Sequence, residues 1–263
     1  MATFNKRGYK APKEKAEKLD NNYIEDVNVD EKDSATAKAF QTLDQSASKA
    51  EDFVAKNQKY ILGFLVFVAV ATVSYLMYQK FIAEPKQVEA ANELFVAQQN
   101  FQKATDDATG TKSDSLFNLV LKGSEGKQGV VEIANEYSGT DAGNLANYYA
   151  GIAYLNTKKY AEAITSLEKF SSKDVMLSTL AKGAIGDAYA QQNKQKEALE
   201  FYIKAADANK NDFTRPRYLL KAGKTALALG NKADALKYFT DIKDNYEATP
   251  EAQQIDALIG LAQ

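Results

Sequence analysis

The sequence contains no cysteine and no histidine among its 263 residues. Their absence excludes thiol nucleophiles, disulfide bonds, Cys/His zinc sites and imidazole general bases. Proline and glycine are few, at four and 14 residues, which argues against disorder over most of the chain. The formal net charge of -2 gives no general attraction to nucleic acid. We therefore expect no catalytic, cofactor-binding or metal-binding residues and no nucleic-acid partner.

Charge is also missing from one long segment, residues 60–79 (YILGFLVFVAVATVSYLMYQ), which Lys59 and Lys80 flank. A helix of this length spans roughly 30 Å, the thickness of the hydrocarbon core of a bilayer. The alternative is the core helix of a soluble domain, but the segment has no polar stripe. The sequence predicts a single membrane-spanning helix over 60–79.

The distribution of Lys and Arg around this segment predicts its orientation. Eleven of these residues precede the segment, whereas the 20 residues after it contain only Lys80 and Lys86. Because cytoplasmic flanks carry the excess of positive charge, we expect a cytoplasmic N-terminus and a C-terminal domain on the other side of the membrane. The inverted topology, with the C-terminal domain in the cytosol, remains the alternative.

The part of the chain before the span divides into two regions. Residues 1–33 are rich in charge, basic over 1–18 and acidic over 20–33, and are expected to be a disordered cytoplasmic tail. A solvated tail is favoured over one that contacts anionic lipid or ribosomal RNA. Residues 34–59 predict an amphipathic juxtamembrane helix that begins after Ser34. Its apolar residues recur at intervals of three and four, which leaves a homodimer open; they are Phe40, Leu43, Ala47, Ala50 and Val54.

A spaced pattern recurs in the second half of the chain at intervals of 35 and 37 residues. Each copy has a Gly, then Tyr or Ala three residues later, Ala twelve residues later, and a large apolar residue four beyond that. The three copies are Gly151, Tyr154, Ala163 and Leu167; Gly186, Tyr189, Ala198 and Tyr202; and Gly223, Ala226, Ala235 and Phe239. This period is typical of stacked pairs of helices, in which small residues permit close packing.

The pattern predicts an all-α fold in which residues 83–263 form an α-solenoid. We expect three repeats over 144–177, 179–212 and 216–249, a capping helix over 250–262, and degenerate repeats over 84–137. Pro85 is expected to break or bend the helix that leaves the membrane. The expected helices span 143–156, 160–171, 178–191, 194–207, 215–228 and 231–244.

The three copies resemble the tetratricopeptide repeat. The whole layout also resembles the YfgM-like ancillary subunits of the SecYEG translocon, and the stretches 144–170 and 185–192 are similar to versions from Bacteroidetes-type bacteria. This resemblance implies a bacterial inner-membrane location, a periplasmic repeat domain, and contact with Sec translocon subunits, periplasmic chaperones or secretory clients. Two non-Sec alternatives are an envelope-assembly or cell-division scaffold and a regulatory subunit of an enzyme.

In tetratricopeptide repeats, fixed positions of each first helix line a concave groove. Carried over to this sequence, those positions predict a mostly apolar groove with a few charges, suited to an extended peptide or a helix. The candidate partner-binding residues are Leu145, Tyr148, Ile152, Leu155, Asp187, Gln191, Arg217, Leu220 and Lys224. The alternative for each apolar member is ordinary packing between helices. The segment GSEGKQG (123–129) lacks the residues of a phosphate-binding loop and is expected to be a flexible turn.

Overall fold

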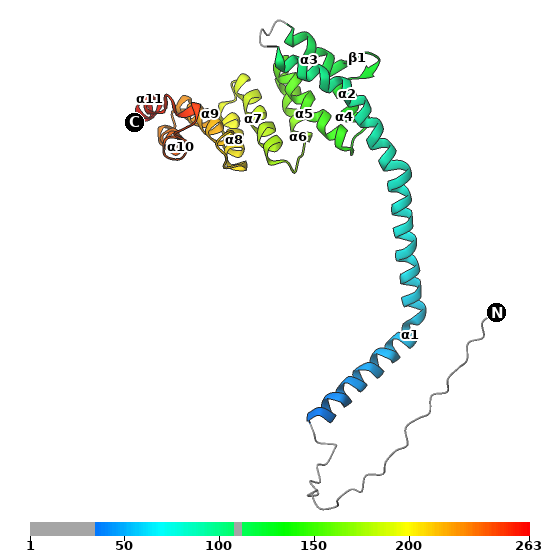
Figure 1. The fold of residues 1–263 in the computed structure, drawn as a ribbon. Coiled ribbons are helices and arrows are strands. Elements are labelled where there is room, and N and C mark those ends of the chain that lie inside the picture. Colours follow the sequence, from blue (N-terminus) through cyan, green and yellow to red (C-terminus); the bar gives the residue numbers. More distant parts are fainter. Residues whose placement is uncertain (1–34, 108–111) are drawn as a thin grey trace, which may run out of the picture. The chain divides into compact units, whose positions relative to one another are not determined.

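The computed structural model describes residues 35–107 and 112–263 (Figure 1). By its internal contacts the chain divides into two units, Met1–Thr72 and Val73–Gln263. The expected tail over 1–33 and the expected cap at Ser34 lie outside the described residues. The described chain is all-α apart from one two-stranded hairpin. By length and composition, one helical stretch of the described residues could cross a membrane, and it contains the uncharged segment.

The residues expected to form the juxtamembrane helix and the membrane span lie in a single helix, α1 (Ala35–Tyr78). A π-helical turn, η1 (Gln79–Ala83), and a further helix, α2 (Glu84–Asp106), follow without a break. The helix therefore continues past Pro85, so of the two expected outcomes, a break or a bend, the break does not occur. Proline lacks an N–H and crowds the carbonyl four residues before it. The preceding turn is wider, with the Glu84 N–H bonded to the Gln79 carbonyl, and it accommodates the proline.

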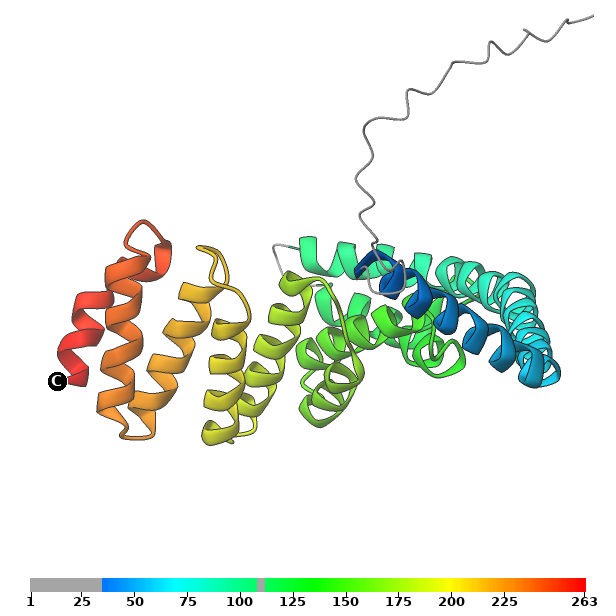
Figure 2. The ribbon, with the colours of Figure 1, turned by 90° about the horizontal axis from the view of Figure 1, so that it is seen from below.

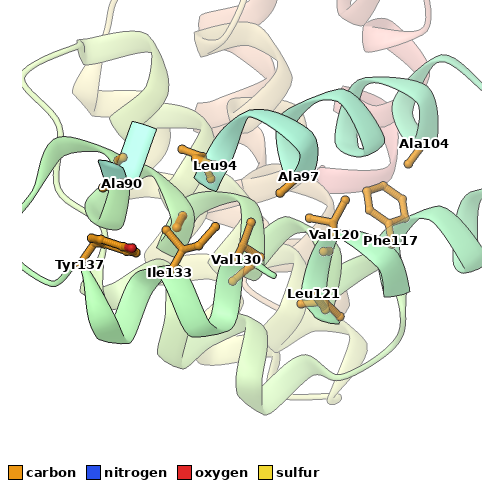
Figure 3. Close-up of a cluster of buried hydrophobic side chains, with 14 residues drawn as sticks. Ala90, Leu94, Ala97, Ala104, Phe117, Val120, Leu121, Val130, Ile133 and Tyr137 are labelled. Carbon is orange, nitrogen blue, oxygen red and sulfur yellow. The ribbon is translucent and has the colours of Figure 1, made fainter. Parts of the chain in front are cut away.

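The first core of the second unit is built from four helices: α2, α3 (Ser113–Lys122), α4 (Val130–Glu136) and α5 (Asp141–Asn156). One face of α2 is buried at intervals of three and four residues, the period that brings side chains to one side of a helix. Figure 3 shows Leu94 of α2 near Ile133 and Val130 of α4, and Phe117 of α3 near Ala97 and Ala104. Residues 84–137, where degenerate repeats were expected, thus contribute α2, α3 and α4 to this core.

Residues 123–128 form a β-hairpin rather than a flexible turn. Strands β1 (Gly123–Ser124) and β2 (Lys127–Gln128) are antiparallel, and the two residues between them, Glu125 and Gly126, both have positive φ. Positive φ at both positions is typical of the tight turn that matches strand twist. Glu93 of α2 holds the hairpin in place by accepting from Lys127 Nζ at 2.7 Å. That bond holds the pKa of Glu93 below its usual value.

The repeats consist of three helix pairs that follow one another along the second unit (Figure 2). The first pair is α5 with α6 (Tyr160–Lys169), the second is α7 (Val175–Gln191) with α8 (Gln195–Ala208), and the third is α9 (Arg215–Ala228) with α10 (Lys232–Asn245). The bounds agree with the expected helices to within three residues.

The turn inside each pair uses the same backbone geometry. The second residue after the first helix has positive φ at Lys158, Asn193 and Gly230, with values of 62°, 60° and 80°. The next N–H then bonds to a carbonyl five residues back, as for Lys159 N–H to the Tyr154 carbonyl at 2.8 Å. This closure satisfies free carbonyls at a helix end and reverses the chain.

The chain ends in two short pieces where one capping helix over 250–262 was expected. A 3-10 turn, η2 (Pro250–Ala252), precedes helix α11 (Ile255–Ala262). The backbone departs from helical geometry at Gln254 (φ -122°, ψ 18°), and the next residue, Ile255, is buried in the core formed by α8 to α11. The interruption separates the proline-led turn from the segment that packs on α10.

Candidate partner-binding surface

The glycine of each repeat faces the large apolar residue of the second helix in the same pair. A methyl group added to Gly151 would overlap Leu167, one on Gly186 would overlap Tyr202, and one on Gly223 would overlap Phe239. The repeat alanines Ala163, Ala198 and Ala235 are fully buried. Of the two repeat tyrosines, Tyr154 is half-buried and lies beneath the Lys159 ammonium, while Tyr189 packs against Phe201 with 5.5 Å between ring centroids. The contact between the glycine and the large apolar residue fixes the spacing of the two helices in each pair.

Helix α5 supplies the aromatic and aliphatic end of the predicted groove. Tyr148, Ile152 and Leu155 are half-buried and pack against the core formed by α6 and α7. The Tyr148 ring lies 5.2 Å from that of Phe170, and burial raises the pKa of its hydroxyl. These three side chains therefore contribute both to packing and to the half-exposed surface of α5.

Leu145, the fourth groove residue of α5, lines a cavity of about 1120 Å³. This cavity lies between the α4–α5 turn and the α6–α7 connection. Beside it, the Asn144 side chain donates to the Ser171 carbonyl at 2.6 Å and accepts from the Ser171 N–H at 3.0 Å. The cavity is lined mainly by polar and charged residues, with Asn and Ser the most frequent types. Nothing in the sequence pattern predicted it.

Helix α7 contributes Asp187 and Gln191, and the first is not a free charge. The Asp187 carboxylate accepts from Lys221 Nζ at 2.5 and 2.8 Å, and from the Tyr202 hydroxyl at 2.8 Å. These bonds join α7, α8 and α9. The Asp187 carboxylate, which was expected to face a partner, is therefore already hydrogen-bonded within the fold. Gln191 is exposed and accepts a long hydrogen bond from Tyr160 at 3.4 Å.

Two residues of this network, Tyr218 and Lys221, were not among the candidate groove residues. Tyr218 covers Gly183, where an added methyl group would overlap its ring, so α9 approaches α7 closely at this point. Burial raises the pKa of Tyr218 to about 12. The Lys221 ammonium lies 5.5 Å from the Tyr202 ring and 5.9 Å from the Tyr218 ring. A glycine at 183 was the available signal, because it leaves space for a ring from the next repeat.

Helix α9 supplies the cationic end of the surface. Arg217 and Lys224 are exposed and make no hydrogen bond or ion pair within the described residues, whereas Leu220 is half-buried. The three lie at intervals of three and four residues and so on one side of α9. The candidate surface changes from aromatic and aliphatic on α5 to unpaired positive charge on α9.

Comparison with known proteins identifies the repeat. The family model of the tetratricopeptide repeat matches residues 181–212, which cover most of α7 and all of α8. No curated protein and no solved structure matches the chain. The chain therefore carries a tetratricopeptide repeat, a type of unit that serves in protein–protein interaction scaffolds. The pairs on either side, α5–α6 and α9–α10, have the same contact between a glycine and a large residue.

Proposed function

We propose that this protein is a non-catalytic, membrane-anchored scaffold of the bacterial cell envelope that binds another protein on the surface of α5, α7 and α9. The observation that carries the proposal is the tetratricopeptide repeat at 181–212, flanked by two pairs with the same internal contact. Such repeats generally act as non-enzymatic scaffolds.

The character of the surface supports a protein partner. The side chains of Tyr148, Ile152 and Leu155 are half-exposed and largely apolar. Covering them with a partner removes apolar surface from water, which favours binding. Arg217 and Lys224 add unpaired positive charge, which favours a partner with acidic side chains at that end. An extended segment or an amphipathic helix with apolar residues followed by acidic ones would match both ends.

Anchoring in a membrane is supported by the exposed apolar helix. Leu62, Phe64 and Phe67 are each more than half exposed, and nearly every side chain of 60–78 is exposed in the same way. An uncovered apolar surface of this length is unfavourable in water and favourable in lipid. The excess of Lys and Arg before the span supports a cytoplasmic N-terminus and a periplasmic repeat domain. Confinement to the membrane would also raise the local concentration of a membrane-bound partner.

The partner that we propose is the Sec translocon, with periplasmic chaperones or secreted clients reached through it. This rests on the resemblance of the layout to the ancillary subunits of that translocon. A photoreactive amino acid introduced at Arg217 or at Lys224 tests the surface and the partner together in living cells. Lys237, exposed on α10, is the matched control position.

The proposal expects products containing a Sec subunit from the two α9 positions and at least fivefold less from Lys237. Products with cell-wall or division proteins alone would support the rival scaffold instead. Equal yields from all three positions would show that α9 is not the binding surface.

A further inference from the structure

Helix α2 has a second apolar stripe, which faces away from the core. Its inner face, with Ala90, Leu94 and Ala97, is buried, but Val88 and Phe95 are 62% and 57% exposed. Only a few other large apolar side chains of residues 84–107 and 112–263 are exposed to a comparable degree, and they are scattered over other helices and one turn. An exposed valine and phenylalanine on one side of one helix therefore call for an explanation.

The spacing of the stripe is that of a two-helix seam. Val88 and Phe95 are seven residues apart, and Asn92 lies between them, with Ala91 beside it. In a coiled coil, the residues that contact the partner helix recur at alternating intervals of four and three. Val88, Asn92 and Phe95 have these intervals. A single asparagine in such a seam selects two parallel strands in register, because each amide then meets its own counterpart.

The surroundings of the stripe leave room for another helix. Val88 and Asn92 line a cavity of about 580 Å³, whose other lining residues include Pro85 of α2 and Lys127 of the hairpin. Asn92 makes no hydrogen bond within the described residues, so its amide is available to a partner. Glu84 lies just before the stripe, and its negative charge is offset by an ion pair with Lys80 at 3.3 Å.

We infer that the stripe of Val88, Ala91, Asn92 and Phe95 binds the same stripe of a second copy of this chain. The inference rests on the membrane anchoring proposed above. Val88 lies nine residues after Gln79, or about 13 Å along a helix. Two copies held in one membrane therefore present the stripe at the same height and in the same direction. Each residue then meets its own counterpart, which is the arrangement that the asparagine requires.

Membrane confinement also explains why so short a seam is sufficient. Two apolar layers and one polar layer form only a weak coiled coil in free solution. When two helices are held in one membrane, their association becomes nearly intramolecular, with an effective concentration far above that of free solution. The dimer would place two copies of the α5–α9 surface on one assembly.

The absence of native cysteine allows a direct test in the full-length protein in its own membrane. Val88→Cys and Phe95→Cys each introduce the only thiol of the chain at the seam, and Lys86→Cys introduces one at an exposed position on the opposite side of α2. Mild oxidation forms a disulfide only where the two Cα atoms approach to about 4.4–6.8 Å. We expect at least tenfold more linked dimer from the two seam variants than from Lys86→Cys.

A second variant checks that the seam itself is responsible. Phe95→Glu in the Val88→Cys background places two like charges in the seam, so the yield of linked dimer should fall at least fivefold. Coexpression of two tagged forms of different length should give three linked species, which identifies both partners as this chain.

The outcomes separate the dimer from the anchoring. A chain that stays in the membrane pellet after alkaline washing but gives equal linkage at all three positions contradicts the dimer alone. Loss of the chain from the pellet contradicts the anchoring. Protection of Cys at 88 and 95 from a water-soluble maleimide without any linked dimer would mean that lipid or another protein covers the stripe, and would also overturn the inference.

Discussion

The contact between Gly186 and Tyr202 gives the sharpest prediction about stability. A methyl group on Gly186 would lie 2.7 Å from the Cδ1 and Cε1 atoms of Tyr202, where ordinary contacts are 3.4–4 Å. The ring has little freedom to move, because Tyr202 is 4% exposed and its hydroxyl donates to Asp187 at 2.8 Å. Gly186→Ala must therefore push α7 and α8 apart or displace the ring.

Two opposing effects set the size of the change. Replacing glycine by alanine within a helix is favourable by about 1 kcal/mol. Overpacking of a core typically costs about 1–3 kcal/mol, and disturbing the Tyr202–Asp187 hydrogen bond adds about 1 kcal/mol. We expect Gly186→Ala to lower the free energy of unfolding by about 1–3 kcal/mol. The melting temperature should fall by about 2–4 °C for each kcal/mol.

Gly260→Ala is the matched control. Gly260 lies in α11, and an added methyl group there meets no atom within 4 Å. The control should gain up to about 1 kcal/mol, since only the helix preference changes. Far-UV circular dichroism of the full chain in detergent, followed during heating, measures both variants. If Gly186→Ala raised the melting temperature as Gly260→Ala does, the proposed packing of α7 on α8 would be refuted.

Three further predictions concern a turn, a helix cap and pH. Lys158→Gly should raise the free energy of unfolding by about 1 kcal/mol, since Lys158 has a φ of 62° that glycine adopts without strain; the midpoint of urea unfolding measures this. Thr140→Ala should lower it by about 1 kcal/mol in the same assay, because the Thr140 hydroxyl accepts from the Gly143 N–H at 3.0 Å at the start of α5. Burial raises the pKa of Tyr218 to about 12 and also raises that of Tyr202. Unfolded tyrosine ionises near pH 10, so the unfolded state loses its protons first and the free energy of unfolding should fall as pH rises from about 10 to about 12. An urea midpoint that stays constant over this interval contradicts the burial of these hydroxyls.

The repeat helices could be predicted from the sequence because their signals are local. In the second pair, the spacing of the pattern brings the small residue Gly186 against the large residue Tyr202, close to Ala198. The turns are specified locally as well, by Asn193 and Gly230 at positions that require positive φ. Such signals do not depend on what the rest of the chain does.

The parts that could not be predicted depend on contacts between distant segments. Asp187 was expected to be a groove charge, but its pairing with Lys221 depends on how α9 packs on α7. The hairpin at 123–128 depends on Glu93, which lies about 30 residues earlier in the chain. Pro85 has a strong local preference to end a helix, and the wider turn of η1 overrides it.

The central claim is that a membrane tether holds the repeat domain outside the cytoplasm. It is tested most directly by Gln263→Cys, which places the only thiol of the chain at its last residue. Intact spheroplasts are treated with a maleimide that does not cross membranes, and lysed spheroplasts serve as the reference for full labelling. The account predicts equal labelling in intact and lysed samples, with the protein in the membrane fraction. Labelling only after lysis, or recovery of the protein in the aqueous fraction, would contradict it.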